Sequence, residues 1–314
     1  MILVTGCTGY LGFHICEYLK TKKIPFYGID NFSRSSHKNI IDKEKFLKIN
    51  ISSKHLPKLL EQKKIHTVIH AAAYSFPPES EDKKKIYYKN NILKTKIFID
   101  YCHKIKIKKF IFFSSSNVYD FNSNKIISVK ETQKLFPKNY YGQTKLIIER
   151  YLNNKFDSCY ILRLFNIAGY VNKDNFYEFK NKYRRILPVI NEAFRKKLTF
   201  KINLIKSKSK AVFPGRDFVH IKDFLEIIFL IIKKQSANNL ILNVGNNKLV
   251  HLDEIINVFE KKLKIKIDFK KIISTKGNLN YTLCNNALIK KKLKFNFKFN
   301  LNKIVKSCIN KKII

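Results

Sequence analysis

Three glycines near the start of the chain, Gly6, Gly9 and Gly12, constrain its fold more than any other feature. They follow a short apolar run, Ile2–Thr5, and lead into a segment, Leu11–Leu19, whose apolar side chains recur on one helical face. A strand, a tight turn and a helix in this order bring the backbone close to a pyrophosphate at the helix N-terminus. Only nine of the 314 residues are glycine, so three within the first twelve are informative. The pattern predicts a dinucleotide site at the edge of a parallel sheet.

Asp30 ends the next predicted strand, Phe26–Asp30, and follows the last glycine of the motif by 18 residues. A carboxylate in this place accepts hydrogen bonds from the adenosine ribose and repels a 2′-phosphate, which favours NAD over NADP. Arg34, four residues further on, works against that preference, because an arginine can bind a 2′-phosphate. We expect Asp30 to dominate and NAD to be the cofactor.

The first half of the chain alternates short apolar runs with helical patterns, as expected for a parallel sheet with crossover helices. Further strands are predicted at Phe46–Asn50, Thr67–His70, Phe110–Ser114, Cys159–Phe165 and Leu240–Val244, and further helices at Ile86–Cys102 and Lys145–Leu152. The predicted fold class is α/β, a Rossmann-type doubly wound parallel sheet with a smaller C-terminal substrate-binding lobe. We expect an NAD-binding domain at 1–165, which the strand near 240–245 rejoins, and a substrate-binding lobe made mostly of 166–314.

Charge and cysteine content limit the possible partners. The formal net charge is +40, but the lysines are scattered and form no stripe interleaved with aromatic residues. We therefore interpret the charge as a solvated surface and expect no nucleic-acid partner. The six cysteines show no C-x-x-C and no zinc spacing, which predicts reduced thiols and no metal site. The longest apolar run, Ile227–Ile232, is too short for a bilayer and no signal peptide precedes the first strand, so we expect a cytoplasmic protein with no membrane partner.

Tyr141 and Lys145 form a Y-x-x-x-K pair, which places a phenol and an ammonium on one helical face. Tyrosine has a pKa of roughly 10 in water, and a neighbouring cation favours its phenolate, which can then act as a general base. The spacing alone is weak evidence in a chain so rich in Tyr and Lys. The serine run 114–116 follows a predicted strand and would bring a hydroxyl to the same edge of the sheet. With the dinucleotide motif, these residues predict a Ser–Tyr–Lys oxidoreductase site.

Further segments give the chain a resemblance to a known family. They are TGCTGYLG at 5–12, DNFSRS at 30–35, HAAA at 70–73, YYKNN at 87–91, SSSNVY at 114–119, YYGQTK at 140–145, LRLFNIAG at 162–169, GRDFVHIKD at 215–223 and LNVGN at 242–246. With these motifs the chain resembles the extended short-chain dehydrogenase/reductase family, of the NAD-dependent epimerase/dehydratase type, and looks most like its UDP-glucose 4-epimerases. The resemblance covers nearly the whole chain. It implies NAD as cofactor, a nucleotide sugar (in particular a UDP-sugar) as substrate, 4-epimerisation through a 4-keto sugar, and a homodimer.

The resemblance also implies roles for particular residues. Counting back from Val118 places the catalytic hydroxyl on Ser115, beside Tyr141 and Lys145, with Ser116 as the alternative. The NAD site would comprise Gly6, Gly9, Tyr10, Leu11, Gly12, Asp30, Asn31, Ser35, Ile51, Ala71, Ala72, Asn90, Lys145 and Phe165.

The substrate would contact a second group of residues. By the same resemblance Asn166 and Arg216 would hold its diphosphate, and a guanidinium suits that role because it binds phosphate through two parallel hydrogen bonds. In 4-epimerases of this family a late side chain crowds the 2-position of the sugar. Counting forward from Gly277 gives Thr282 at that place, with the bulky Tyr281 next to it. Threonine leaves room for an acetamido group, so we expect UDP-N-acetylglucosamine to be accepted alongside UDP-glucose.

Three features depart from the family. Asn50 stands where an acidic residue usually lies near the adenine. Segment 274–278 reads Ser-Thr-Lys-Gly-Asn in place of an arginine pair, so a nucleotide-binding arginine is missing and only Lys276 or Lys271 could replace it. The insertion near 170–185 is shorter than the family's and unlike it.

Several rival functions remain open. A 4,6-dehydratase of this family needs an Asp-Glu pair where this chain has Ser116 and Asn117, so elimination of water would lack its acid and base. A C5 or double epimerase, a keto-sugar reductase and a non-catalytic NAD-binding regulator all remain compatible with the motifs. The intact Ser115, Tyr141 and Lys145 favour a catalyst over a regulator.

Overall fold

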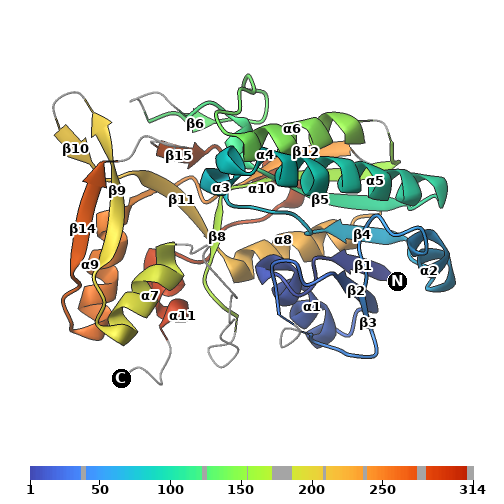
Figure 1. Ribbon diagram of the computed structural model, residues 1–314, viewed down its shortest axis with the longest axis horizontal. Coiled ribbons are helices and arrows are strands. Elements are labelled where there is room, and N and C mark those ends of the chain that lie inside the picture. Colours follow the sequence, from blue (N-terminus) through green and yellow to red (C-terminus); the bar gives the residue numbers. More distant parts are fainter. Residues whose placement is uncertain are drawn as a thin grey trace.

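The computed structural model describes residues 1–36, 40–121, 126–153, 155–171, 186–207, 210–235, 239–273 and 281–309. Its largest element is a parallel sheet with helices on both faces, at the right of Figure 1, and a smaller lobe lies at the left. The Rossmann-type α/β fold predicted from the sequence is therefore confirmed. Within these residues, no helix has the length and apolar content needed to cross a membrane.

The large sheet has seven parallel strands in the order β12-β7-β5-β4-β1-β2-β3. Their bounds are β1 Ile2–Thr5, β2 Phe26–Asp30, β3 Phe46–Lys48, β4 Thr67–His70, β5 Lys109–Ser115, β7 Ser158–Leu164 and β12 Asn239–Val244. Alternate side chains enter opposite layers, so Ile2 and Val4 belong to one hydrophobic cluster and Leu3 to the other. The chain runs outward from β1 through β2 to β3 and then returns past β1 to β4. Ligands of open α/β sheets bind at such a reversal of strand order.

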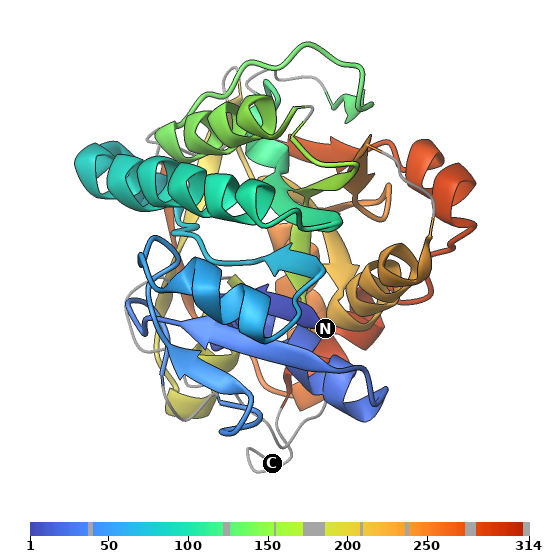
Figure 2. The ribbon, with the colours of Figure 1, turned by 90° about the vertical axis from the view of Figure 1, so that its right-hand side faces the viewer.

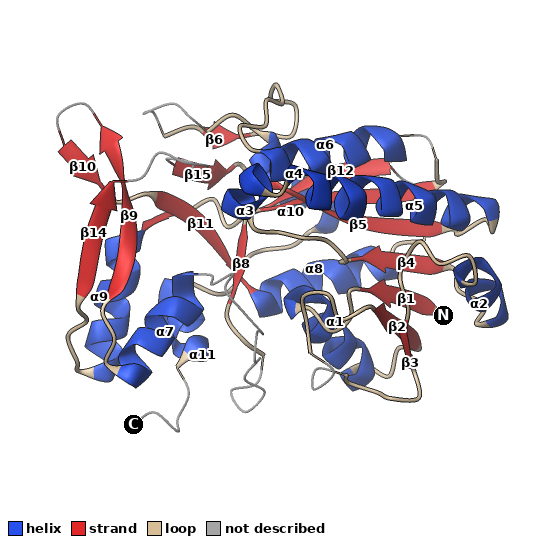
Figure 3. Cartoon of the chain, viewed as in Figure 1, coloured by secondary structure: helices blue, strands red, loops and turns tan. Residues whose placement is uncertain are grey.

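Two layers of helices bury the faces of this sheet, as Figures 1 and 3 show. One face carries α2 Leu56–Gln62, α3 Pro77–Asp82, α4 Lys84–Tyr87, α5 Lys94–Lys104 and α6 Tyr140–Leu152. The other face carries α1 Tyr10–Thr21, α8 Ile221–Lys233 and α10 Ala287–Leu293. Burial on both faces explains why the central strands read as continuous apolar runs in the sequence.

The helix predicted at Ile86–Cys102 is not continuous. A π-helical turn, η2 Tyr88–Leu93, separates α4 from α5. Within it the side chain of Asn91 exchanges two hydrogen bonds of 2.9 Å with the backbone of Tyr74, while Asn90 lines the cavity described below. A π-turn changes the angular spacing of consecutive side chains and is frequent at functional sites. Here it turns two adjacent asparagines toward different partners, which a regular helical pattern does not predict.

The smaller lobe contains elements that were not predicted from the sequence. Three strands, β9 Phe200–Ser207, β10 Lys210–Val212 and β14 Phe269–Ile273, form a sheet, and α7 Ile186–Lys196, α9 Leu252–Leu263 and α11 Leu301–Cys308 pack beside it. The three helices are amphipathic, with apolar side chains on one face and polar side chains on the other. α11, for example, buries Ile304, Val305 and Cys308 among exposed or half-buried polar residues.

A small connecting sheet is centred on β11 Gly215–His220, between the lobe and the large sheet. β11 pairs in parallel with β8 Asn166–Ala168 and β15 Tyr281–Cys284, and antiparallel with β13 Leu249–His251; β6 Ser128–Val129 pairs with β15. These strands come from widely separated parts of the chain. Their pairing brings together side chains that lie far apart in sequence.

Candidate active site

A cavity of about 570 Å³ lies at the carboxyl ends of the parallel strands. All residues assigned from the sequence to cofactor, substrate or catalysis line it, as do Ser116 and Asn50. Lys271 is not among the lining residues; its ammonium lies 5.8 Å from the ring of Phe213. Lys276, Gly277 and the rest of 274–280, like most of the insertion near 170–185, fall outside the described residues. We call the part formed after β1, β2 and β4 the cofactor end, and the part formed by β8, β11 and β15 the substrate end.

The glycine loop at the cofactor end has no space for side chains. Gly6 has a φ of 64°, and a Cβ there would lie 2.8 Å from the Cα of Ala72. A Cβ on Gly12 would lie 2.1 Å from the carbonyl oxygen of Gly6. The first turn of α1 therefore approaches the end of β1 so closely that only glycine fits at these two positions. The N-terminus of α1 is left facing the cavity, where it can bind an anion.

Asp30 is fixed by donors from the glycine loop and from the turn that follows β2. The amides of Thr8 and Phe32 donate to its two carboxylate oxygens at 3.2 and 2.8 Å, and the hydroxyl of Ser35 donates at 3.2 Å. Asn50 forms a local turn instead, because its side-chain oxygen accepts from the amide and hydroxyl of Ser52. Its oxygen is thus partly committed at the position where the family carries an acidic residue.

Tyr141 and Lys145 lie in the first turns of α6, and both are buried. Asn139 caps this helix by accepting from the amide of Gly142 at 2.8 Å. Ser80 of α3 accepts from the amide of Tyr141 at 3.0 Å. A Cβ on Gly142 would lie 2.2 Å from the carbonyl oxygen of Asn117, so the helix start packs directly against the end of β5. These contacts fix the position of the tyrosine relative to the serine run.

Lys145 is held between the tyrosine and the sheet. Its ammonium donates to the carbonyl of Phe113 at 2.7 Å and lies 5.8 Å from the ring centre of Tyr141. Burial lowers the pKa of Lys145 to about 7, and the carboxylate of Glu149 acts in the opposite direction. The ammonium is therefore easily converted to the neutral amine, and negative charge arriving in the cavity would restore its proton.

The three serines after β5 differ in their partners. Ser114 donates to Glu149, and Glu149 in turn forms a buried ion pair of 2.8 Å with Arg163. Ser115 accepts two hydrogen bonds from Asn117, one from its amide at 3.2 Å and one from its side chain at 3.0 Å. With both lone pairs occupied, the hydroxyl of Ser115 acts as a donor toward a third group. Ser114 is committed to structure, which leaves Ser115 and Ser116 as candidates.

Asn117 is a site residue whose role was missed in the sequence. Its side-chain nitrogen donates to Ser115, and its side-chain oxygen accepts from Asn139 at 2.7 Å. It therefore links the serine to the cap of the helix that carries Tyr141. In the sequence, Asn117 was noted only because a 4,6-dehydratase would carry a carboxylate at that position. Its position two residues after Ser115 was visible, but the partner at Asn139 lies 22 residues further on.

Strand pairing assembles the substrate end. In the parallel pairs of β11, Arg216 is opposite Thr282 and Phe218 is opposite Asn166. The side-chain nitrogen of Asn166 donates to the backbone carbonyl of Asp217 at 3.2 Å. Burial lowers the pKa of Arg216 to about 10, which leaves it charged near neutral pH. A cavity wall carrying a half-buried guanidinium suits an anionic ligand.

Thr282 and Tyr281 have different surroundings. Thr282 lines the cavity and is 2% exposed, whereas the ring of Tyr281 packs edge-on against His251 with centroids 5.8 Å apart. Within the described part of the chain, the Oγ1 of Thr282 has no hydrogen-bond partner. A buried hydroxyl without a partner carries a desolvation cost.

The doubly wound parallel sheet and the cavity at the carboxyl ends of its strands define a dinucleotide-binding fold of the Rossmann type. A model of the NAD dependent epimerase/dehydratase family matches residues 2–245, so the chain belongs to this family. The glycine loop fits that cofactor, because its lack of side chains leaves the backbone of α1 open to a pyrophosphate. NAD would be held by this loop, Asp30 and Lys145, and the family's cofactor agrees with the prediction from sequence.

The chain is also similar in sequence to characterised enzymes and in fold to solved structures. A UDP-glucose 4-epimerase of Lacticaseibacillus casei is 28% identical over 269 residues, which cover 83% of this chain and 80% of that protein. A dTDP-D-glucose 4,6-dehydratase of Dictyostelium discoideum is 29% identical over 285 residues, covering 82% and 62%. The structure of UDP-glucose 4-epimerase from Bifidobacterium longum in complex with NAD+ and UDP has a TM-score of 0.90, with 98% and 97% coverage and 21% identity, a likeness of fold.

Proposed function

We propose that this protein is an NAD-dependent nucleotide-sugar 4-epimerase that interconverts UDP-glucose and UDP-galactose through a 4-keto sugar. One observation carries the proposal: the glycine loop, the pair Tyr141 and Lys145, and the half-buried Arg216 line a single cavity. A Rossmann motif alone would suit any NAD enzyme, but a guanidinium in the same cavity supports a diphosphate-bearing substrate. The names of the 4-epimerases among the relatives support the reaction type.

The residues divide the chemistry among them. Tyr141 would accept the proton of the sugar 4-hydroxyl, and Lys145 would favour its phenolate and hold the nicotinamide ribose. Ser115, already accepting twice from Asn117, would donate its hydrogen to the reacting oxygen. When bound, NAD supplies the hydride acceptor and donor at C4. The lobe, mostly 166–314, would bind the nucleotide sugar loosely enough for the 4-keto sugar to turn over before reduction.

The test is the conversion itself. Purified enzyme is incubated separately with UDP-glucose and UDP-N-acetylglucosamine, and NMR follows the 4-epimers. Tyr141→Phe removes only the phenolic hydroxyl, so we expect normal folding and NAD content with turnover lowered by about 10² or more. Unchanged turnover in this variant would refute the proposed base.

Thr282 supports acceptance of the acetamido sugar as well. Its small side chain lines the cavity and its hydroxyl lacks a partner among the described residues, while Tyr281 packs on His251. Thr282→Tyr should abolish conversion of UDP-N-acetylglucosamine and retain that of UDP-glucose, because a packed wall has no spare volume. Turnover of UDP-glucose alone by the unmodified enzyme would show that the pocket is closed to the acetamido group.

A 4,6-dehydratase is the main rival, since one relative bears that name. It would need carboxylates at Ser116 and Asn117, and Asn117 is instead bonded to Ser115 and Asn139. The same NMR experiment separates the two reactions. A 4-keto-6-deoxy sugar would support the dehydratase, and a 4-epimer the epimerase.

We also propose a homodimer in the cytoplasm. Leu93, Ile97 and Ile147 are 41%, 41% and 37% exposed on η2, α5 and α6, which lie side by side in Figure 2. These apolar side chains favour pairing with the same helices of a second copy. Ile97→Glu with Ile147→Glu should give monomers in sedimentation, whereas Ile265→Glu, at an exposed site in the lobe, should not. The free, buried state of all six cysteines supports a reducing compartment.

A further inference from the structure

Arg34 occupies a place that conflicts with the cofactor of this family. It lies four residues after Asp30 and lines the cavity beside Ser33 and Ser35. In Rossmann folds an arginine close to the end of the second strand accommodates the 2′-phosphate of NADP. An unrestrained guanidinium here would attract the wrong cofactor.

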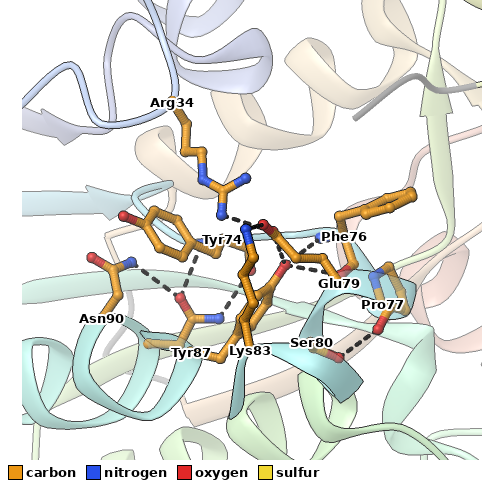
Figure 4. Close-up of polar contacts among 10 residues, drawn as sticks. Arg34, Tyr74, Phe76, Pro77, Glu79, Ser80, Lys83, Tyr87 and Asn90 are labelled. Atoms are coloured by element: carbon orange, nitrogen blue, oxygen red, sulfur yellow. Dashed lines mark hydrogen bonds and ion pairs between the residues drawn. The ribbon is translucent and has the colours of Figure 1, made fainter. Parts of the chain in front are cut away.

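Glu79 binds this arginine from another part of the chain. Its Oε2 lies 2.7 Å from the terminal nitrogen of Arg34, and its Oε1 lies 3.2 Å from the ammonium of Lys83. Figure 4 shows these residues and the ion pairs between them. The acidic and basic partners differ in exposure: the side chain of Glu79 is 6% exposed and that of Arg34 28%. Glu79 itself does not line the cavity. The carboxylate therefore binds one terminal nitrogen of the guanidinium at the wall of the cavity.

Two tyrosines complete this arrangement. The guanidinium carbon of Arg34 lies 4.1 Å from the ring centre of Tyr74. Tyr87 is fully buried, and the one hydrogen of its hydroxyl is shared between the backbone carbonyl of Phe76 at 2.8 Å and the Oε2 of Glu79 at 3.1 Å. The same hydroxyl accepts from the amide of Phe76 at 3.2 Å. Glu79 is thus held in place independently of Arg34. Moving the guanidinium to a phosphate would break a charge-assisted hydrogen bond and a stacking contact, and would leave a buried carboxylate with less compensation.

We propose that Glu79 is a positioning residue for cofactor selection: it sequesters Arg34 and so prevents the arginine from binding the 2′-phosphate of NADP. Asp30 repels that phosphate directly, and Glu79 removes the cation that would offset the repulsion. The NAD preference then has two independent parts, one on the second strand and one at the start of α3.

Titration of NAD and NADP into each variant at one ionic strength tests the proposal without any sugar. Glu79→Gln keeps the shape and the bond from Tyr87 but removes the charge. We expect NADP to bind about tenfold more tightly to it, the scale of one additional charge-assisted hydrogen bond, with NAD affinity within about twofold. The increase should vanish in Glu79→Gln with Arg34→Ala. Lys83→Ala, which removes the other cation on Glu79, is the matched control and should leave the ratio unchanged.

An unchanged NADP affinity in folded Glu79→Gln, or an increase that persists without Arg34, would overturn the proposal. Binding of NAD reports that each variant is folded. Arg34→Ala alone is a second test that does not depend on Glu79→Gln. If Glu79 sequesters Arg34, removing the arginine should not change the affinity for NADP. Weaker NADP binding in that variant would mean that Arg34 already reaches the phosphate and that Glu79 does not sequester it. Because only binding is measured, failure here would leave the proposed epimerase reaction untouched.

Discussion

The cofactor end and the substrate end of the cavity are built in different ways. At the cofactor end, the two glycines Gly6 and Gly12 and the hydrogen-bond donors to Asp30 all come from the first 35 residues. At the substrate end, Asn166, Arg216 and Thr282 come from three strands that meet only through β11. The first is a local motif that tolerates little change, because backbone meets backbone. The second depends on strand pairing, so a change in one strand should alter substrate binding and leave the cofactor in place.

The largest effect is expected from Gly12→Ala. Its Cβ would lie 2.1 Å from a carbonyl oxygen, so α1 must move. We expect the free energy of unfolding to fall by about 3 kcal/mol. NAD affinity should fall by about 100-fold, equivalent to about 2.7 kcal/mol. Thermal unfolding and NAD titration measure the two effects.

Gly9→Ala is the matched control for that variant. Gly9 has a φ of −79°, and its Cβ would meet only one oxygen, at 3.3 Å, so the fold should hold. NAD binding should still weaken, because the methyl group would occupy the path of the pyrophosphate. Equal loss of stability in both variants would show that the two glycines do not have separate roles.

Arg216→Lys sharpens the contrast between the two ends. The substitution keeps a positive charge but loses the planar fork that binds a diphosphate through two hydrogen bonds. We expect affinity for UDP to fall about 30-fold, or about 2 kcal/mol, while NAD affinity stays the same. Calorimetric titration with each ligand gives both numbers. Unchanged affinity for UDP would mean that another cation binds the diphosphate. The substrate end would then not depend on Arg216 as described.

The smallest effect is expected at Asn117, which links Ser115 to Asn139 at the start of the helix that carries Tyr141. Asn117→Ala removes the side-chain donor to Ser115 and the acceptor for Asn139, while the backbone amide still reaches Ser115. We expect kcat to fall about tenfold, or about 1.4 kcal/mol, with little change in KM. Asn117→Asp keeps an acceptor for Asn139 but cannot donate to Ser115. If orientation of the serine matters, both variants lose kcat; a normal kcat in Asn117→Asp would limit the role of Asn117 to capping.

Prediction from sequence succeeded where the signal was local. The bounds of β1, β2 and β4 match the predicted strands, and those of β5, β7 and β12 differ by one residue at one or both ends. Buried parallel strands bounded by polar turns give short apolar runs that are easily read. The same reasoning failed at η2, where a π-turn interrupts a helical pattern, and in the lobe, where three amphipathic helices were not identified.

The sequence by itself determined the glycine turn between β1 and α1, because a tight turn between strand and helix requires glycines at fixed spacing, and these residues are neighbours in the chain. It also determined the Tyr141–Lys145 pair, which one helical turn brings together. Only the tertiary structure decided which residues meet across the cavity. It set Thr282 beside Arg216 through parallel pairing, joined Ser115 to the cap of α6 through Asn117, and placed Glu79 against Arg34. These contacts follow from how separate strands and helices pack, and packing depends on the whole core, which no local pattern encodes.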